Sequence, residues 1–534
     1  MEEKEKQTVE DSSPVDVDVG TAADVEEVMK KYDRESNTKI WEGLPKEIIR
    51  YAMAAFMIFM VYVSMFSSMD GSVRRCWFLG LILVFVYVMY PVKKGSVTRV
   101  NYMPWYDVVL AALSIGTFGY QIYFLDELVY KGSRLDTLDI IIGTLAILLL
   151  IEACRRVVGI PIIVVVVVFM CYALLGSGME FKDLVYTLFY TGQGILGTPI
   201  QVCSTYIFLF VLFGAFLEAT GIAAFFIDLA NAIAGSATGG PAKVAVISSA
   251  LCGMVSGSSV GNTVTTGSVT IPMMKKTGYK PEFAGAVEAA ASTGGQIMPP
   301  IMGAAAFLMA EFTGAPYGTI AMRAILPAVL YFTGIYIAVH LEAKKLGLKG
   351  IPREQLPRVR QLLPKIYLLA PLVLLVVMVS TNMYTMAFSA AIAIVAAVAV
   401  GLVNNVVEIA SKSSNREDFL TFGKIIDALE GGAKGSITVA VACGVAGIIS
   451  GCITVTGLAS KLLSTIVSLS GGHMIIALAL TMLCCIVLGM GVPTTANYCI
   501  MAATCAPILM DPSIGVTKMA AHFFAVSYTH LTLP

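Results

Sequence analysis

ALCGMVSGSSVGNTVTTGSVTIPMMKKTGYKPEFAGAVEAAASTGGQIMPPIMGAAAF, residues 250–307, is the stretch of the chain that decides the fold. Its flanks are apolar, but two polar islands interrupt it, at 256–266 and at 292–296, and the second ends at Pro299 and Pro300. Because glycine loosens a helix and proline removes a backbone donor, we expect a helix to break at each island. At membrane depth, broken backbone is tolerated only where protein buries it or where it lines a cavity. The stretch is therefore predicted to hold the functional centre.

The composition of the whole chain predicts a membrane protein. Of its 534 residues, 57% are hydrophobic and 13% are charged, the mean hydropathy is +0.80, and the formal net charge is zero. A soluble domain carries about a quarter charged residues. No basic cluster alternates with aromatic residues, so we expect no nucleic-acid partner. The eleven cysteines lie mostly in apolar runs and the four histidines are scattered, so no metal centre and no cofactor other than a coupling ion is expected.

Residues 1–44 are acidic and lack the pattern of a cleavable signal, so we expect a solvated cytoplasmic tail. Apolar runs of about 20 residues span a bilayer. The predicted spans are 48–66, 76–91, 105–124, 138–151, 160–175, 200–217, 325–341, 366–380 and 387–403. Lys93, Lys94, Arg155 and Arg156 mark cytoplasmic loops, which places the amino terminus inside.

Two apolar pieces on either side of the first polar island, 243–255 and 264–274, are too short to span singly, and they predict a re-entrant hairpin. The segment 222–234 before them is short and amphipathic, which suits a helix along the membrane interface. A long segment, 282–312, follows the hairpin and is interrupted at 292–300.

A second copy of this arrangement follows. Thr456-Gly457-Leu458-Ala459 echoes Thr220-Gly221-Ile222-Ala223, and GMGVPTTAN at 489–497 echoes the hairpin turn that ends at Asn262. Asn262 and Asn497 are 235 positions apart (497 − 262). Counting spans from the basic loop at 344–365 gives the two copies opposite orientations in the membrane. Inverted repeats with broken helices are typical of secondary transporters.

Three motifs carry a resemblance to a known family: SGSSVGNTVTTGSVTIPMMKKTGY at 256–279, EAAASTGGQIMPP at 288–300 and GMGVPTTANY at 489–498. They resemble the large membrane subunit of tripartite ATP-independent periplasmic (TRAP) transporters. The four spans ahead of them resemble the small subunit, fused through one extra span. The resemblance implies sodium-driven uptake of an organic acid delivered by an extracytoplasmic solute-binding protein, with elevator-type movement. It also implies a multi-pass protein of the bacterial or archaeal cytoplasmic membrane.

The resemblance covers residues 45–525, and the last residues depart from it. In the family a second broken helix follows the second hairpin, whereas residues 527–534 do not match a span of this kind. We therefore expect a shortened carboxyl end and a second ion site that this chain does not complete. The predicted domains are a tail (1–44), a small-subunit-like domain (45–158), a connection (159–199), a first repeat (200–341), a basic loop with two spans and a linker (342–434), a second repeat (435–525) and an atypical tail (526–534).

Sodium needs several oxygen ligands, which hydroxyls, amides and unwound carbonyls can supply. In the first repeat the predicted ion ligands are Ser256, Ser258, Asn262, Thr263, Ser292, Thr293, Gly294 and Gln296. In the second repeat they are Gly491, Thr494, Thr495 and Asn497, and the predicted substrate contacts are Ser259, Pro299 and Thr495. Small residues that only allow close helix packing are the structural alternative.

Two other functions stay open. Residues 257–261 match the G-x-S-x-G pattern of a serine nucleophile, which predicts an intramembrane protease with Ser259 as nucleophile and His340 or His473 as base. That motif requires a preceding strand, and none is readable here. A proton-coupled transporter or a channel is the second alternative. Glu288 lies one helical turn before Ser292 and either helps to hold a cation or proton or reaches water at a helix end.

Overall fold

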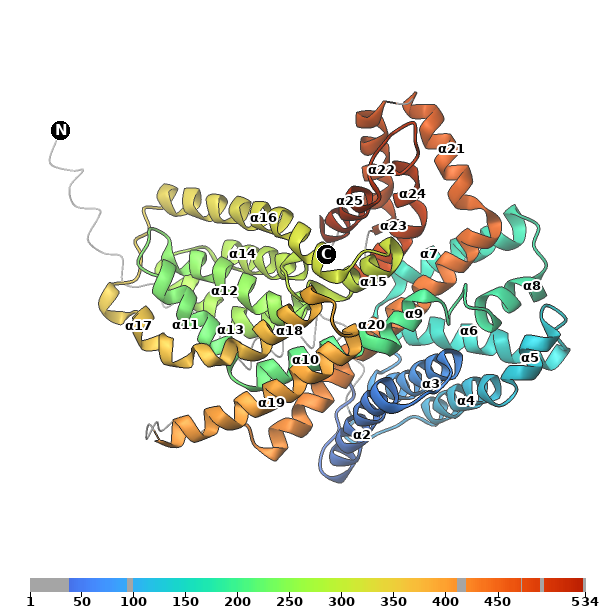
Figure 1. Cartoon of the computed structure of the whole chain (residues 1–534), viewed down its shortest axis with the longest axis horizontal. Helices are drawn as coiled ribbons and strands as arrows, with labels where there is room; N and C mark the ends of the chain where they lie inside the picture. Colours follow the sequence, from blue (N-terminus) through green and yellow to red (C-terminus); the bar gives the residue numbers. More distant parts are fainter. Residues whose placement is uncertain (1–37, 94–98, 411–418, 472, 490–493, 532–534) are drawn as a thin grey trace.

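The computed structural model describes residues 38–93, 99–410, 419–471, 473–489 and 494–531, and within these ranges the chain contains helices and no strand (Figure 1). The predicted all-α polytopic fold is confirmed. Eight helices of the described part are long and apolar enough to cross a membrane, or nine if the bent pair α4 and α5 counts as one span. The protein is an integral membrane protein. Most of the predicted amino-terminal tail lies outside the described residues.

In the small-subunit-like part, identifiable residues mark where helices begin, end or bend. Asp70 caps the helix Gly71–Met89 by accepting a hydrogen bond from the Ser72 amide at 2.7 Å. A turn at Phe124 bends α4 against α5 by 69°. The helices are α2 (Leu44–Phe66), α3 (Gly71–Met89), α4 (Trp105–Tyr123), α5 (Leu125–Lys131), α6 (Thr137–Val157) and α7 (Ile160–Cys171).

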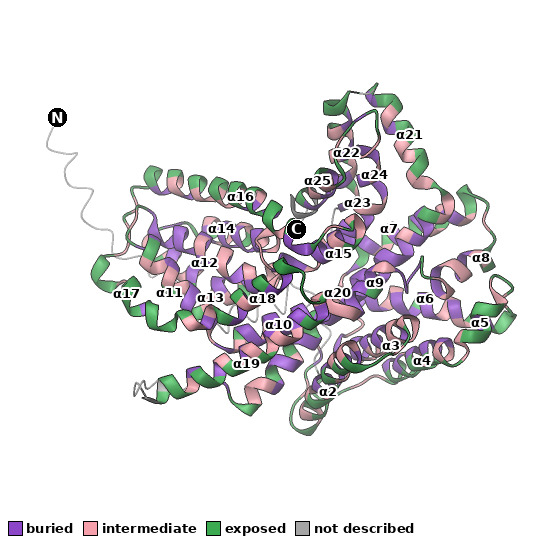
Figure 2. Cartoon of the chain, viewed as in Figure 1, coloured by how far each residue is buried: buried purple, intermediate pink, exposed green. Residues whose placement is uncertain are grey.

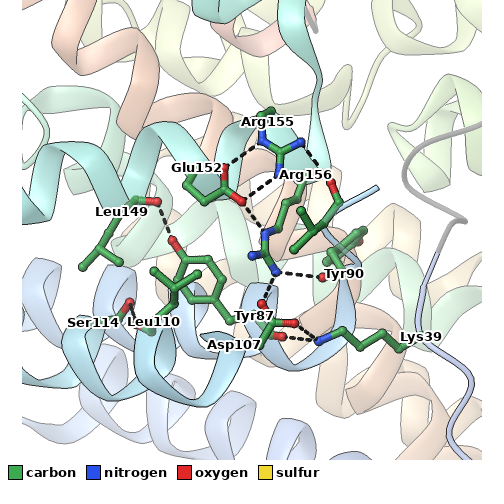
Figure 3. A network of polar contacts seen from close by, with 11 residues as sticks. Lys39, Tyr87, Tyr90, Asp107, Leu110, Ser114, Leu149, Glu152, Arg155 and Arg156 are labelled. Atoms are coloured by element: carbon green, nitrogen blue, oxygen red, sulfur yellow. Dashed lines mark hydrogen bonds and ion pairs between the residues drawn. The ribbon is translucent and has the colours of Figure 1, made fainter. Parts of the chain in front are cut away.

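A buried cluster of charges ties the start of this domain together (Figure 3). The Asp107 carboxylate is fully buried and accepts from Lys39 Nζ at 2.6 Å and from Arg156 at 2.7 Å. Arg156 also pairs with Glu152 at 2.8 Å and lies over the Tyr87 ring. Removing one member of such a cluster leaves an uncompensated buried charge, which costs about 3–5 kcal/mol. Lys39 is 8% exposed, so the prediction of a solvated tail up to residue 44 is wrong for Lys39.

One helix forms the centre of the molecule. Helix α20 (Phe422–Thr456) is 35 residues long, and 78% of its most apolar window is buried. Its glycines let neighbouring backbones approach, because a Cβ on Gly447 would lie 2.4 Å from the Gly194 carbonyl oxygen. It contacts α2, α3, α6, α7, α10 (Phe208–Ala219) and α23 (Thr494–Thr504). The predicted linker at 404–434 is therefore partly helical core: its last residues, 422–434, begin α20.

The two repeats share one order of elements. Gly221 and Gly457 both adopt left-handed backbone conformations, with φ of 81° and 63°, and end a long apolar helix. A helix of 13 residues follows each, α11 (Ile222–Ala234) and α21 (Leu458–Ser470), and then a hairpin. The hairpins are α12 (Gly240–Ser256) with α13 (Ser259–Thr277), and α22 (Met474–Gly489) with α23. The turn of the second hairpin at 490–493 lies outside the described residues.

The remaining helices are α8 (Phe181–Val185), α9 (Thr198–Val202), α14 (Pro281–Gly294), α15 (Gly303–Thr313), α16 (Tyr317–Lys345), α17 (Val359–Leu362), α18 (Ala370–Thr381), α19 (Met386–Ala410), α24 (Ala506–Leu509) and α25 (Lys518–Leu531). Figure 2 shows buried residues along α10, α12 and α20 and mostly exposed ones along α16. Only 22% of the most apolar window of α16 is buried inside the protein, so its apolar surface suits contact with lipid.

A separate hydrophobic core holds the first hairpin to the helices after it. Ala242 and Ala245 of α12, Met274 of α13, Ala284 of α14 and Val339 of α16 are buried together. This cluster is distinct from the main core, which runs from the small-subunit-like domain through α10 and α20. Helices α12, α13, α14 and α16 thus share a core of their own, while α12 and α16 also contribute residues to the main core, Cys252 of α12 and Tyr317 and Ile320 of α16.

Candidate functional site

The tip of the first hairpin is a helix end facing a helix start. Helix α12 ends at Ser256, Gly257 turns the chain with a φ of 59°, and α13 begins at Ser259. The Ser258 hydroxyl accepts a hydrogen bond from the Gly261 amide at 3.2 Å, so it caps α13. The prediction of a break at the first polar island is confirmed.

The second polar island is the point where α14 gives way to α15. Helix α14 continues through Ser292 and Thr293 to Gly294, and a single 3₁₀ turn, Gly295–Ile297, follows. The break therefore lies at 298–302 and not at Ser292, because both hydroxyls are used within the helix: Ser292 donates to Glu288 and Thr293 to the Ala289 carbonyl. Tyr317 donates to the Pro300 and Ile301 carbonyls, at 2.7 and 2.6 Å, and so satisfies backbone oxygens that the break releases.

The hairpin is pressed directly onto this broken helix. A Cβ on Gly253 would lie 2.3 Å from the Gly295 Cα, and one on Gly295 would lie 2.7 Å from the Gly253 Cα. Only two glycines allow backbones to meet at this distance. The contact brings the polar residues of the hairpin tip next to those of the broken helix, as the sequence predicts.

Two amide side chains lie at this junction, and each has an oxygen that accepts no hydrogen bond from the described residues. Asn262 Nδ2 donates to the Ser249 carbonyl at 2.8 Å, and Gln296 Nε2 donates to the Ser259 hydroxyl at 3.2 Å. The oxygens Asn262 Oδ1 and Gln296 Oε1 are buried and have no hydrogen-bond partner among the described residues. A buried oxygen without a partner is costly, so each is an acceptor ready for a cation or a donor.

A fully buried carboxylate lies one layer deeper in the same group of helices. Glu288 of α14 accepts hydrogen bonds from Ser249 at 2.8 Å, from Ser292 at 3.1 Å, and from Thr266 and Thr270. No lysine, arginine or histidine of the described ranges forms an ion pair with it. The alternative that Glu288 reaches water at a helix end is wrong, because its exposure is 0%. Ser249 connects the two layers, since its carbonyl accepts from Asn262 and its hydroxyl donates to Glu288.

The other predicted ligands of the first repeat lie around the junction in different roles. The Thr263 hydroxyl donates to the Ser259 carbonyl at 2.9 Å, and the Ser256 hydroxyl donates to the Ser258 carbonyl at 3.4 Å. Because both protons are used in this way, the two hydroxyl oxygens can act only as acceptors. Gly294 packs against α16, where a Cβ would lie 2.4 Å from the Tyr331 ring. The alternative of packing glycines therefore holds for Gly294.

The second repeat presents a corresponding asparagine. Asn497 is fully buried in α23, and neither atom of its amide has a partner within the described ranges. Thr495 is 7% exposed, Thr494 begins the helix, and Gly491 lies outside the described residues. No hydrogen bond of the described residues joins Thr495 to Ser259 or Pro299, so their shared substrate contact stays a prediction. Tyr498 and His522 form a buried hydrogen bond of 2.8 Å between α23 and α25.

The serine-protease alternative finds no support in the geometry. Ser259 follows a helix and a turn rather than a strand, and its hydroxyl accepts from Gln296 and donates to no histidine among the described residues. His340 lies on α16 and His473 precedes α22. A nucleophile needs its base within hydrogen-bonding distance, and no such pair involves Ser259 in the described part of the chain.

The sequence analysis did not assign Ser249, Thr266 or Thr270 to the site. A spacing signal was present, because Thr266 and Thr270 are four residues apart on α13, as Glu288 and Ser292 are on α14. Residues four apart share one face of a helix. The sequence did not show that these faces of α13 and α14 pack against each other, because their contact depends on how α12, α13 and α14 cross.

These features define a class: a polytopic membrane protein with repeated re-entrant hairpins and a broken helix, which is the architecture of a secondary transporter. Comparison with protein-family models identifies the family. Residues 145–533 match the model of the tripartite ATP-independent periplasmic transporter, DctM component. The chain belongs to this family. The match begins inside α6, so the fused small-subunit-like domain stays a prediction.

Individual relatives match over parts of their length. The C4-dicarboxylate TRAP transporter large permease protein DctM of Pseudomonas aeruginosa is 31% identical over 147 residues, which are 28% of this chain and 34% of the relative. Its namesake in Vibrio cholerae is 27% identical over 213 residues, 39% and 44% of the two chains. The isethionate TRAP transporter permease protein DctMQ of Oleidesulfovibrio alaskensis is 26% identical over 227 residues, 42% of this chain and 33% of that one. The chain thus spans between a third and a half of the length of these three.

Proposed function

We propose that this protein is the membrane permease of a sodium-coupled transporter that takes up an organic acid delivered by an extracytoplasmic solute-binding protein. The permease lies in the cytoplasmic (inner) membrane with its amino terminus inside. Membership of the family supports the dependence on a binding protein. The positive-inside distribution of Lys93, Lys94, Arg155 and Arg156 supports the orientation.

One observation carries the assignment of sodium: Asn262 Oδ1 and Gln296 Oε1 are buried where the hairpin meets the broken helix and find no partner among the described residues. The Asn497 amide, at the equivalent place in the second hairpin, likewise has none within the part of the chain that the structure describes. A hard cation prefers neutral and anionic oxygens. The donor set fits sodium, because the junction offers amide oxygens together with hydroxyl oxygens and backbone carbonyls of the hairpin turn. Asn262, Gln296, Ser256 and Ser259 would hold the ion.

The substrate class rests on chemistry that the relatives share. Their names specify C4-dicarboxylates and isethionate, which are anions of organic acids. In this chain α13 begins at Ser259, and the amino end of a helix attracts anions. We propose that Ser259, Pro299 and Thr495 contact the carboxylate substrate.

Movement of the elevator type is supported by the separate core of α12, α13, α14 and α16. A unit with its own buried apolar contacts can shift against α10 and α20 without losing its fold. Such a shift would carry the junction of Asn262 and Gln296 from one side of the membrane to the other.

Sodium dependence tests this proposal directly. Proteoliposomes that contain the permease and its cognate binding protein should accumulate the acid under an inward sodium gradient. Each coupled sodium supplies about 2.3 kcal/mol per 100 mV of membrane potential in addition to its concentration gradient. Equal uptake driven by a proton gradient with sodium absent would contradict the assignment and favour the proton-coupled alternative.

Replacing Asn262 by alanine should reduce uptake at least tenfold while expression stays near that of the parent. The substitution removes an amide oxygen from the ion and the Nδ2 bond to Ser249, which is worth only about 1 kcal/mol of stability. Sodium titrations of initial uptake rates measure the effect, with Thr277→Ala near the cytoplasmic end of α13 as a matched control. Parental uptake by Asn262→Ala would favour a packing role for the hairpin tip.

A further inference from the structure

Two neighbouring hollows share one residue, Glu218 at the end of α10. A small cavity of about 20 Å³ lies between α10, α11 and the first hairpin, and Glu218, Ser256, Asn262 and Thr265 supply its polar lining. A wider cleft of about 370 Å³ lies between α10 and α20, where Glu218, Lys424 and Asp427 are the charged lining residues. A cavity of roughly 10–15 Å³ holds one water, so the small cavity has room for a single water-sized particle.

The carboxylate of Glu218 joins the fixed part of the protein to the hairpin. Glu218 Oε1 accepts a hydrogen bond from the Thr265 hydroxyl of α13 at 2.9 Å. The rest of α10, FLFVLFGAFLEA, contains no other ionisable residue. Its backbone approaches the hairpin closely, because a Cβ on Gly214 would lie 2.9 Å from the Val255 carbonyl oxygen. Of the described residues that line the small cavity, Glu218 is the only charged one, beside the neutral polar groups of Ser256, Asn262 and Thr265.

Asn262 supplies an independent sign that a cation belongs at the inner end of a path from the wide cleft into the small cavity. Its side chain lines the small cavity, the residue is 1% exposed, and its Oδ1 has no partner among the described residues. At the other end of the path, in the wide cleft, Asp427 already forms an ion pair with Arg50 at 2.8 Å. Glu218 is thus the carboxylate that faces both the open cleft and the cavity that reaches Asn262.

We propose that Glu218 guides the coupling cation between the wide cleft and the site beside Asn262, and that this is the route on the cytoplasmic side. The inference rests on the proposed function for the identity of the ion. The side follows from the orientation given above, in which α10 ends and α20 begins at the cytoplasmic face. A carboxylate beside a narrow path lowers the energy barrier to the passage of a cation and raises the barrier to the passage of an anion. Thr265 holds the carboxylate and releases it when the hairpin moves.

Charge-selective labelling tests the route without any need for transport. Ala219 lines the wide cleft next to Glu218, so Ala219→Cys places a thiol there. Membrane-impermeant cationic and anionic methanethiosulfonate reagents are added to inside-out vesicles, and mass spectrometry identifies the labelled residue among the native cysteines. After correction for the reactivity of a free thiol, the cationic reagent should react about tenfold faster. Adding Glu218→Gln should reduce that preference at least threefold, whereas Glu311→Gln, at an exposed carboxylate of α15, should leave it unchanged.

Uptake measurements give the second readout. In proteoliposomes, Glu218→Gln should raise the sodium concentration for half-maximal uptake about five- to tenfold, with Thr265→Val intermediate and Thr265→Ser close to the parent. An unchanged labelling preference in Glu218→Gln, or labelling of Ala219→Cys only from the outside, would overturn the proposed route. If parental uptake does not depend on sodium, the proposed function fails, and the labelling preference alone decides whether Glu218 selects cations.

Discussion

Valine in place of Gly253 should abolish uptake while leaving the permease in the membrane. Even the Cβ of the new side chain would lie 2.3 Å from the Gly295 Cα, and that atom belongs to backbone that no rotamer change can move aside. Helices α12 and α14 would have to separate by more than 1 Å, at a cost of about 1–3 kcal/mol for an overpacked contact. The separation would displace the hairpin tip, which carries Asn262, from the broken helix, which carries Gln296, and the proposed sodium site needs oxygens from both.

The matched control lies on α14, the helix that leads into the turn of Gly295. A Cβ on Gly285 of α14 meets no atom within 4 Å, so Gly285→Ala adds a methyl group without a clash. It should transport within about twofold of the parent and gain helix stability of a few tenths of a kcal/mol to about 1 kcal/mol. Sodium-driven uptake per copy of inserted protein is the measurement for both variants. Uptake by Gly253→Val at the rate of Gly285→Ala would show that close contact at this junction is not required.

Alanine in place of Glu288 should be the most destabilising single change in the first repeat. It removes the acceptor of four hydroxyls and leaves a cavity in a fully buried place. Thr266 and Thr270 can turn to carbonyls of their own helix, at 2.8 and 3.0 Å. The Ser249 hydroxyl keeps the Thr266 hydroxyl as a partner at 3.0 Å, whereas Ser292 loses its acceptor. One unsatisfied hydroxyl and the cavity together cost about 2–5 kcal/mol.

Thermal unfolding in detergent measures this effect through the fraction of monodisperse protein that survives heating. Glu288→Gln keeps the volume and one acceptor oxygen, so it should lose about 1 kcal/mol. Glu282→Ala, at an exposed position in the first turn of α14, should unfold with the parent. If Glu288→Ala unfolds at the same temperature as Glu282→Ala, the hydroxyl cradle does not depend on the carboxylate, and Ser292 must find another acceptor.

Much of the fold could be predicted because its signals are local. A run of about 20 apolar residues spans a bilayer wherever it occurs, so the spans that form α2, α3, α4 and α6 were predicted, whereas α20 was not among the predicted spans. Gly221 and Gly457 end helices through their own backbone freedom, and the pair Asn262 and Asn497 marks the repeat by spacing alone. The hairpin and the broken helix follow from the same chemistry, since glycine and proline act on the backbone at their own positions.

The positions of amphipathic segments in the fold were harder to predict, because the polarity of one helix does not show which elements pack beside it. Residues 422–434 carry charges and were assigned to a linker, yet they begin α20, where Leu429 and Ala433 are buried against neighbouring helices. Lys39 belongs to an acidic tail in sequence, but a buried Asp107 68 residues away holds it.

The sequence by itself determined the class of the protein, the positions of most of its spans, both hairpins and the asparagine at each, because these depend on local hydrophobicity and on glycine, proline and amide chemistry. The tertiary structure decided which polar atoms meet. Whether Glu288 faces water or four hydroxyls depends on the rotation of α14 against α12 and α13. Which amide oxygens stay unpaired depends on how closely Gly253 approaches Gly295, and the position of Glu218 between two hollows depends on how α10 and α20 pack. Each is a contact across helices, and no single helix encodes the rotation and crossing of its neighbours.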